Sequence, residues 1–227
     1  MRHVARSSPV GNCRRGFETN AGSEMLYRRD GHEIAAELRQ RICMMQSVSE
    51  EMILHEGALA SEFGVSRTPI RQVLQKLAHE RLVETRSGVG TIVSPLDPDK
   101  RDRDVQVLRA LFVAAASCSV EAGVPAQMPE RLVAAAAVAE VSSPGKQSYL
   151  DSRTELLDIT ARAAPDDILA DSLRTAHWRH IRWSMAERVW DRPGAPERLI
   201  GTLRGCAEAA QRDSLSEVYT HLAEQVA

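Results

Sequence analysis

The 227-residue sequence has few cysteines and no long apolar run. Its four cysteines, Cys13, Cys43, Cys118 and Cys206, are scattered and form no C-x-x-C or Cys/His cluster, which argues against a zinc site and fits free thiols in a reducing compartment. No apolar stretch reaches the roughly 18 residues of a membrane-spanning helix. The first residues also lack the apolar core of a secretory signal. We therefore expect a cytoplasmic protein that does not engage a membrane.

Catalytic motifs and an overall basic charge are missing as well. The sequence has no G-x-S-x-G, no H-E-x-x-H and no phosphate-cradling glycine loop, so we expect that it is not an enzyme. The formal net charge is -2, but the charges are unevenly distributed. Residues 1–29 and 64–90 carry an excess of basic side chains, whereas residues 30–63 and 91–227 are acidic on balance. A positive field confined to the N-terminal third is typical of a localised nucleic-acid-binding surface.

Residues 56–77 have the pattern of a helix-turn-helix. Gly64 can adopt the positive φ of a tight turn, and Ser66 is suited to cap the helix that follows. Apolar side chains recur at the helical period on one face of this second helix, at Ile70, Val73, Leu74 and Leu77. The opposite face carries arginine, threonine and glutamine but no acid. Such side chains contact phosphates and base edges in a major groove; a merely solvated amphipathic helix pair is the alternative.

A β-hairpin is expected directly after this helix. Residues 82–86 alternate in polarity, residues 91–93 resume a β-rich run, and Gly88 and Gly90 lie in the turn between them. Its two glycines would let the tip approach a phosphate or a minor groove closely, so the hairpin is predicted to be a wing. The predicted DNA-binding residues are Ser66, Arg67, Thr68, Arg71, Gln72, Gln75, Arg86, Gly88 and Gly90.

The remaining sequence predicts a mainly α protein with two folded parts. Residues 1–28 read as a disordered arm, residues 29–94 as a winged helix-turn-helix of three helices plus a hairpin, and residues 95–104 as a linker with Pro95 and Pro98. The segment 49–54 is ambiguous between an extended stretch and a turn. Residues 105–227 show six helical patterns broken by Pro and Gly and no strand pattern, which predicts a six-helix antiparallel bundle.

The sequence resembles the GntR family of bacterial transcription regulators. The residues that carry the resemblance are Leu59-Ala60, Phe63 to Arg71, Leu74, Leu77, Leu82-Val83 and Arg86 to Val93. The six-helix region, with Val107 to Leu111 near its start, resembles the FadR-type (FCD) effector domain of that family. Arg67, Thr68 and Arg71 match the DNA-contacting helix of the family and Gly90 its wing glycine. Gly57 departs from the pattern, because a basic residue often follows the glutamate there.

The resemblance implies a homodimer that binds a pseudo-palindromic operator in double-stranded DNA. It also implies a helical sensor for a small organic acid, often held with a divalent metal ion. Asp151 fits the family's metal-binding aspartate and His221 its last histidine, while Glu155 stands at a histidine position. Two carboxylates and His221 would suit a hard divalent cation. The alternative is two exposed acids and a surface histidine that bind nothing.

Further candidates for binding an effector carboxylate are Arg109 on the first bundle helix and Arg182 or His180 on the long fourth one. Arginine matches a carboxylate with two parallel hydrogen bonds. In the alternative interpretation, Trp178 packs in the core while the neighbouring histidines and arginines lie on the surface. Together these residues predict a metabolite-responsive transcription regulator. The predicted effector-binding residues are Arg109, Asp151, Glu155, Arg182 and His221. A DNA-binding protein whose helical domain only dimerises stays open as an alternative.

Overall fold

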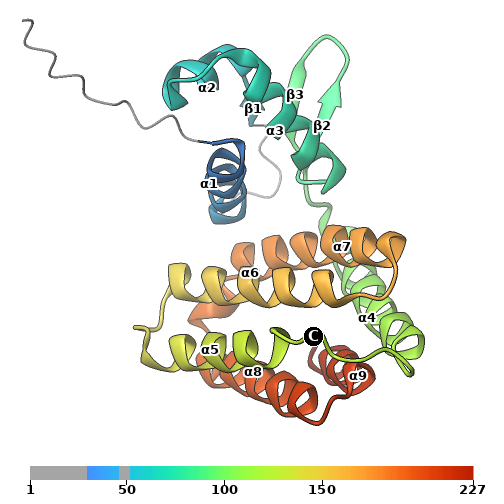
Figure 1. Cartoon of the computed structure of the whole chain (residues 1–227). Helices are drawn as coiled ribbons and strands as arrows, with labels where there is room; N and C mark the ends of the chain where they lie inside the picture. Colours follow the sequence, from blue (N-terminus) through green and yellow to red (C-terminus); the bar gives the residue numbers. More distant parts are fainter. Residues whose placement is uncertain (1–29, 46–51, 227) are drawn as a thin grey trace, which may run out of the picture.

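The computed structural model describes residues 30–45 and 52–226 as a small N-terminal head above a helical bundle (Figure 1). The predicted arm, residues 1–28, lies outside the described residues. The head consists of α1 (Gly31–Met44), β1 (Ile53–Leu54), α2 (Glu56–Phe63), α3 (Arg67–His79), β2 (Val83–Arg86) and β3 (Gly90–Val93). The bundle consists of α4 (Arg101–Cys118), α5 (Met128–Val141), α6 (Lys146–Ala163), α7 (Asp167–Ala186), α8 (Ala195–Gln211) and α9 (Leu215–Gln225). This mainly α architecture confirms the predicted fold class.

The strands form a three-stranded antiparallel sheet in the order β1-β3-β2. The predicted hairpin is β2 and β3, with Val83 opposite Val93 and Arg86 opposite Gly90. The ambiguous segment contributes β1, in which Ile53 pairs with Ile92 of β3. The head is therefore a winged helix-turn-helix whose wing is anchored along a third, two-residue strand.

Local signals explain where the head helices begin and end. Asp30 caps α1, since its side chain accepts hydrogen bonds from the backbone N–H groups of His32 and Glu33, and the Glu33 side chain reaches back to the Asp30 N–H. Gly64 ends α2 in the left-handed conformation at φ 64°. The Val65 N–H then bonds back to the carbonyl of Ala60 at 3.0 Å, which closes the helix end and fixes the turn into α3.

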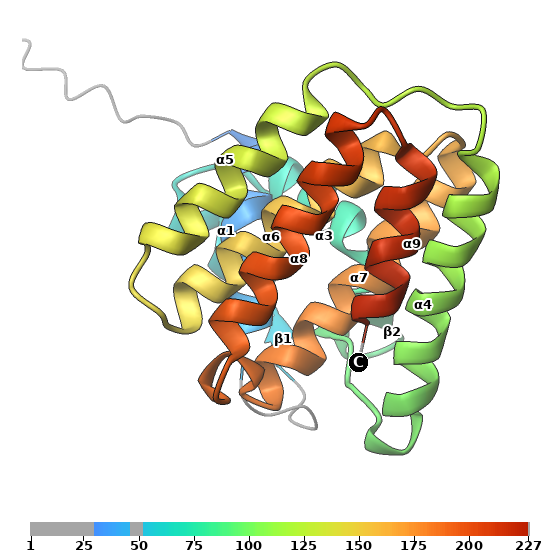
Figure 2. The ribbon, with the colours of Figure 1, turned by 90° about the horizontal axis from the view of Figure 1, so that it is seen from below.

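The bundle helices pack in two layers, with α4 along one side. Helices α6 and α7 lie next to each other beneath the head, and α5, α8 and α9 form the layer farther from it (Figures 1 and 2). The most extensive helix contacts join α4 to α9 and α5 to α8, followed by α8 to α9. Large buried side chains at the centre include Phe112, Leu156 and Tyr219. None of the described helices is long and apolar enough to cross a membrane.

The head and the bundle share a hydrophobic core. Residues of α1, α2, α3 and the sheet pack in one cluster with Leu150, Leu157, Trp178, Ile181 and Met185 from α6 and α7. The connection between the two parts is shorter than the stretch 95–104 that we expected to be a linker. A 3₁₀ turn at Pro98–Lys100 runs directly into α4 at Arg101, because Asp97 accepts a hydrogen bond from the Asp99 N–H and starts the turn.

Candidate nucleic-acid interface

The polar face of α3 is open to solvent. The side chains predicted to contact DNA from this helix are all exposed: Arg67, Thr68, Arg71, Gln72 and Gln75. The opposite face is buried in the head core, with Ile70 and Leu77 fully enclosed. The helix therefore presents one polar surface on a rigid support. Its width and side-chain chemistry suit insertion into a major groove.

Ser66 takes the N-cap position of α3, as expected, but without the expected capping bond. Its backbone is extended, at φ -74° and ψ 168°, and its side chain makes no capping hydrogen bond with α3. The side chain is exposed. The N–H groups at the start of α3 and the Ser66 hydroxyl are thus available to an anion, and helix N-termini favour phosphate oxygens.

Arg71 is held at the surface by Glu56 at the start of α2. Its Nε and Nη2 donate to the two carboxylate oxygens of Glu56 at 3.1 and 2.9 Å. The hydrogen bonds from Arg71 lower the pKa of the Glu56 carboxyl, so that it stays ionised. This contact orients the guanidinium on the exposed face before any DNA arrives, and a phosphate or a guanine edge has to compete with a carboxylate for it.

Arg67 lies over Gly57, the position at which the sequence departs from the resembling family. A Cβ placed on Gly57 would lie 3.5 Å from Arg67 Nη2, which is ordinary van der Waals contact. The guanidinium of Arg67 therefore covers the glycine at the start of α2. Positive charge is present beside Gly57 even though the next residue in the chain does not supply it.

The wing places the remaining predicted residues at the tip of the hairpin. Gly88 and Gly90 have positive φ values, 78° and 114°, and nothing lies within 4 Å of a Cβ built on either. Backbone geometry, not crowding, thus favours glycine at both positions. Arg86 on β2 pairs with the exposed Glu84 at 2.9 Å. The tip offers open backbone next to an arginine, a combination that suits contact with a phosphate backbone.

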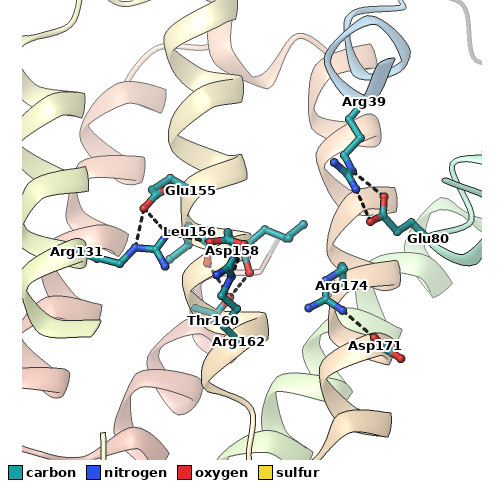
Figure 3. Close-up of polar contacts among 11 residues, drawn as sticks. Arg39, Glu80, Arg131, Glu155, Leu156, Asp158, Thr160, Arg162, Asp171 and Arg174 are labelled. Carbon is teal, nitrogen blue, oxygen red and sulfur yellow. Dashed lines mark hydrogen bonds and ion pairs between the residues drawn. The ribbon is translucent and has the colours of Figure 1, made fainter. Parts of the chain in front are cut away.

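A buried ion pair within the head lies against the bundle. The Arg39 side chain on α1 donates two hydrogen bonds of 2.7 Å to Glu80 at the end of α3 (Figure 3). Both side chains are mostly enclosed, with 12% and 6% exposed. The Arg39 guanidinium also lies 5.8 Å from the ring centre of Trp178 on α7. Arg39 therefore links α1, the end of α3 and the bundle.

The structure does not bring the predicted metal residues together. Asp151 is exposed and accepts a hydrogen bond from Gln147 at 2.8 Å, and Glu155 pairs with Arg131 at 2.7 Å (Figure 3). His221 on α9 lies against α8, so close to Gly205 that a Cβ there would overlap its ring. Across residues 30–45 and 52–226, no three His, Cys, Asp or Glu side chains are arranged to hold a metal. These residues do not fit a single divalent cation.

Asp151 and Glu155 instead line a groove of about 1270 Å³ between the head and the bundle. Side chains of both charges line it, including Arg41 and His79 from the head. Asp158 also lines it, and this carboxylate accepts hydrogen bonds from Arg131 and Arg162. Burial works against its charge, yet these hydrogen bonds lower the pKa of Asp158. Most of the charge in this groove is therefore already neutralised within the protein.

The two arginines proposed as effector contacts point elsewhere than into the bundle. Arg109 is exposed on α4, bonds to the Val226 carbonyl, and lines an outer groove of about 560 Å³ between α4 and α9. Arg182 is buried, and its Nη1 donates to the Ser94 carbonyl at 2.6 Å, next to the head. Burial lowers the pKa of Arg182 from its usual value. Arg182 thus secures the junction between β3 and the bundle.

Several polar residues of the bundle are buried. His177 and His180 are 3% and 8% exposed. One interpretation of the sequence placed them at the surface, and the other made His180 a candidate effector contact inside the bundle. Arg153, which we did not single out, is partly buried on α6. A signal for Arg153 was present, because it lies in register with the apolar residues Leu150 and Leu157. An arginine within such a stripe is placed on the buried side of its helix.

The sequence of the head is similar to sequences of known proteins. Residues 31–93 match the family described as "Bacterial regulatory proteins, gntR family". An HTH-type transcriptional regulator of an unstable DNA locus in Streptomyces ambofaciens is 39% identical over 82 residues, which cover 36% of this chain and 34% of that protein. The gluconate operon transcriptional repressor of Bacillus subtilis (strain 168) is 36% identical over 85 residues, or 37% of this chain and 34% of the repressor. Neither name is that of an enzyme.

These curated relatives match over about a third of their own length. A solved structure allows the whole chain, bundle included, to be compared. The solved structure of E. coli McbR/YncC superposes with a TM-score of 0.60 over 85% of this chain and 93% of that one, at 16% sequence identity. At this identity the match establishes a shared fold for head and bundle together.

Proposed function

We propose that this chain, whose residues 31–93 form a DNA-binding domain of the gntR family, is a transcription regulator that responds to a small organic acid. The observation that carries the DNA-binding part is the exposed face of α3, with its arginines, threonine and glutamines and no acid of its own. Two such heads in a homodimer would bind a pseudo-palindromic operator, with α3 in the major groove and the wing on the backbone. The repressor among its relatives supports repression as the outcome.

The second part of the proposal assigns sensing to the bundle, as in an FCD-like effector domain. The common fold with E. coli McbR/YncC supports this assignment only at the level of architecture. The shared core gives a route for coupling, since α6 and α7 pack directly against the head. A ligand that changes the packing of α7 would change which head orientation is favoured, and operator affinity would follow. The exposed Val113 on α4 and Val120 in the turn after it give apolar surface for a second copy of the chain.

Selection from randomised DNA duplexes with the full-length protein tests the DNA-binding part. We expect enrichment of a pseudo-palindrome whose half-sites are separated by about one or more helical turns of ~10 base pairs. Affinity for the selected duplex, measured by fluorescence anisotropy, should fall roughly tenfold to a hundredfold in Arg71→Ala if Arg71 contacts a base. Arg204→Ala provides the control, because Arg204 is an exposed arginine of the bundle.

Two results would contradict the proposal. Failure to enrich any sequence would exclude an operator, and wild-type affinity in a folded Arg71→Ala variant would remove Arg71 from the interface. An operator affinity that no organic acid changes would favour the second candidate function, a DNA-binding protein whose bundle only dimerises. The metal-binding residues expected for a sensor of this kind do not converge in the described chain, and this observation favours that second candidate.

A further inference from the structure

An acidic side chain lies among the arginines of the DNA-binding face. The exposed face of α3 has no acid of its own, but Glu56, the first residue of α2, reaches Arg71 from the other helix of the helix-turn-helix. Its two carboxylate oxygens accept hydrogen bonds from Nε at 3.1 Å and from Nη2 at 2.9 Å. The Arg71 side chain is 61% exposed and that of Glu56 is 33% exposed. A carboxylate therefore stands at the surface beside an arginine that is placed to meet DNA.

Stability does not account for a carboxylate at this position. An exposed ion pair contributes little to folding, because water screens its charges and both side chains lose freedom. Close to DNA a carboxylate is also unfavourable, since the phosphates carry the same charge. The hydrogen bond from Arg71 is the largest cause that lowers the pKa of Glu56, and the charge of Arg67 acts in the same direction. The carboxylate is therefore ionised when DNA arrives, and its place at the interface calls for a role in recognition.

The ion pair leaves one edge of the Arg71 guanidinium for another acceptor. A guanidinium carries five N–H donors in a planar fork, and Glu56 accepts one from Nε and one from Nη2. The donors of Nη1 and the second donor of Nη2 form the outer edge, which lies outside this pair. Two donors side by side match O6 and N7 of guanine, the base that presents two acceptors in the major groove. A guanine can thus bind Arg71 without displacing Glu56.

We propose that Glu56 is a positioning residue that makes Arg71 select guanine. This inference rests on the proposed function and assigns a specificity determinant to its DNA-binding face. Because the carboxylate holds the Nε–Nη2 edge, the outer edge keeps one orientation and loses less conformational freedom when it binds a base. The charge of Glu56 repels a phosphate oxygen in the same place, whereas the edge of guanine is neutral. Glu56 therefore favours contact with a base over contact with the DNA backbone.

Arg67 gives a comparison one helical turn earlier on α3. Its guanidinium lies over Gly57, with Nη2 3.5 Å from a Cβ built there. Gly57 has no side chain to bond it, so adjacent residues of α2 treat the two arginines differently. We expect discrimination at the base pair read by Arg71 to depend on Glu56, and any contact that Arg67 makes to be independent of it.

Base substitution in the selected duplex tests this role. Each position is replaced in turn, and the affinity of the full-length protein is measured by fluorescence anisotropy. The position read by Arg71 is the one at which the wild type prefers guanine, by roughly tenfold or more for a bidentate contact, and Arg71→Ala does not. In Glu56→Ala this preference should fall at least threefold. Its affinity for a duplex of unrelated sequence should rise, because a negative charge has left the interface.

The variant Glu56→Asp separates orientation from charge. Aspartate keeps the negative charge but is one methylene shorter, so it should lose the guanine preference without gaining affinity for the unrelated duplex. Glu62→Ala is the matched control, because Glu62 lies on the same helix and pairs with Arg41 of α1 instead; it should keep the preference. Melting temperatures verify that each variant is folded, and Glu56→Asp carries the test if Glu56→Ala is not.

The outcomes distinguish this inference from the proposed function. A guanine preference that survives in both Glu56 variants overturns the positioning role, and so does an equal change in the affinity of Glu56→Ala for the selected and the unrelated duplex. Both results leave operator binding intact. If Arg71→Ala loses a guanine preference at no position, Arg71 reads no base and the inference fails. Failure of the wild type to select any sequence overturns the proposed function as well.

Discussion

The recognition face of the head and the interior of the bundle both carry arginine, but in opposite circumstances. Arg71 is exposed and already paired with Glu56, whereas Arg153 is partly buried and has no acidic partner among the described residues. An exposed ion pair contributes little free energy to folding, so a surface arginine can leave its partner and bind DNA. A buried charge without a partner is costly, so its presence points to a specific requirement at that place.

The largest expected effect concerns the ion pairs of the two environments. Removing one partner of a buried pair leaves an uncompensated charge, so Glu80→Ala should lower the free energy of unfolding by about 3–5 kcal/mol. Glu80 is 6% exposed and its partner Arg39 is 12% exposed beside Trp178. Urea denaturation at pH 7 measures the change. The exposed pair gives the comparison, and Glu56→Ala should change stability hardly at all.

A second variant checks the interpretation of that loss. Glu80→Ala combined with Arg39→Met removes both charges and should recover much of the stability, because the cost lies in the stranded guanidinium. Equal small losses in Glu80→Ala and Glu56→Ala would show that water reaches the Arg39–Glu80 pair, and the contrast between the two environments would fail.

The next effect concerns acid sensitivity of the bundle interior. Burial first, and then the charge of Arg153, lower the pKa of His180 to about 3 and that of His177 well below its usual 6.5. Between the unfolded pKa near 6.5 and the folded value, only the unfolded state binds the proton. The stabilisation is therefore complete above pH 6.5 and is lost as the pH falls, by about 1.4 kcal/mol per pH unit for each histidine.

Urea denaturation at pH 7, 6 and 5 measures this dependence. His180→Gln removes one titrating group and should reduce the stability lost between pH 6.5 and 5 by about 2 kcal/mol. His79→Gln is the matched control, since the His79 side chain is 81% exposed. A profile in His180→Gln identical to that of the wild type would mean that water reaches His180 in the native protein.

The head could be predicted closely from sequence because its signals are local. The period of Ile70, Val73 and Leu77 set the buried face of α3, Gly64 set the turn, and the glycines of the wing set the hairpin. Strand β1 could not be assigned in this way. It has two residues, Ile53 and Leu54, and exists through pairing with β3, about 40 residues away along the chain.

The burial of polar side chains in the bundle could not be predicted from local sequence patterns. Pro and Gly breaks predicted its six helices, yet the histidines of α7 were expected at the surface under the simplest interpretation. They are buried because α7 is covered on both sides, by the head through Trp178 and Ile181 and by the bundle through Leu173 and Ala176. Periodicity identifies an apolar stripe but does not reveal a second layer packed over the polar one. The proposed metal residues failed to converge for the same reason, since their placement depends on helices far apart in sequence.

The smallest expected effect tests how tightly the outer layer of the bundle is packed. Gly201 and Gly205 lie one turn apart in α8; a Cβ on Gly201 would meet nothing within 4 Å, whereas one on Gly205 would overlap the His221 ring. Gly201→Ala should raise the free energy of unfolding by roughly 0.5–1 kcal/mol, while in Gly205→Ala an overpacking cost of about 1–3 kcal/mol should cancel or reverse that gain.

In the double variant Gly205→Ala with His221→Ala the overlap is gone, so a thermodynamic cycle should show favourable coupling. Equal gains in both single alanine variants would place His221 away from α8 and leave its unpaired Nε2 free to face a ligand.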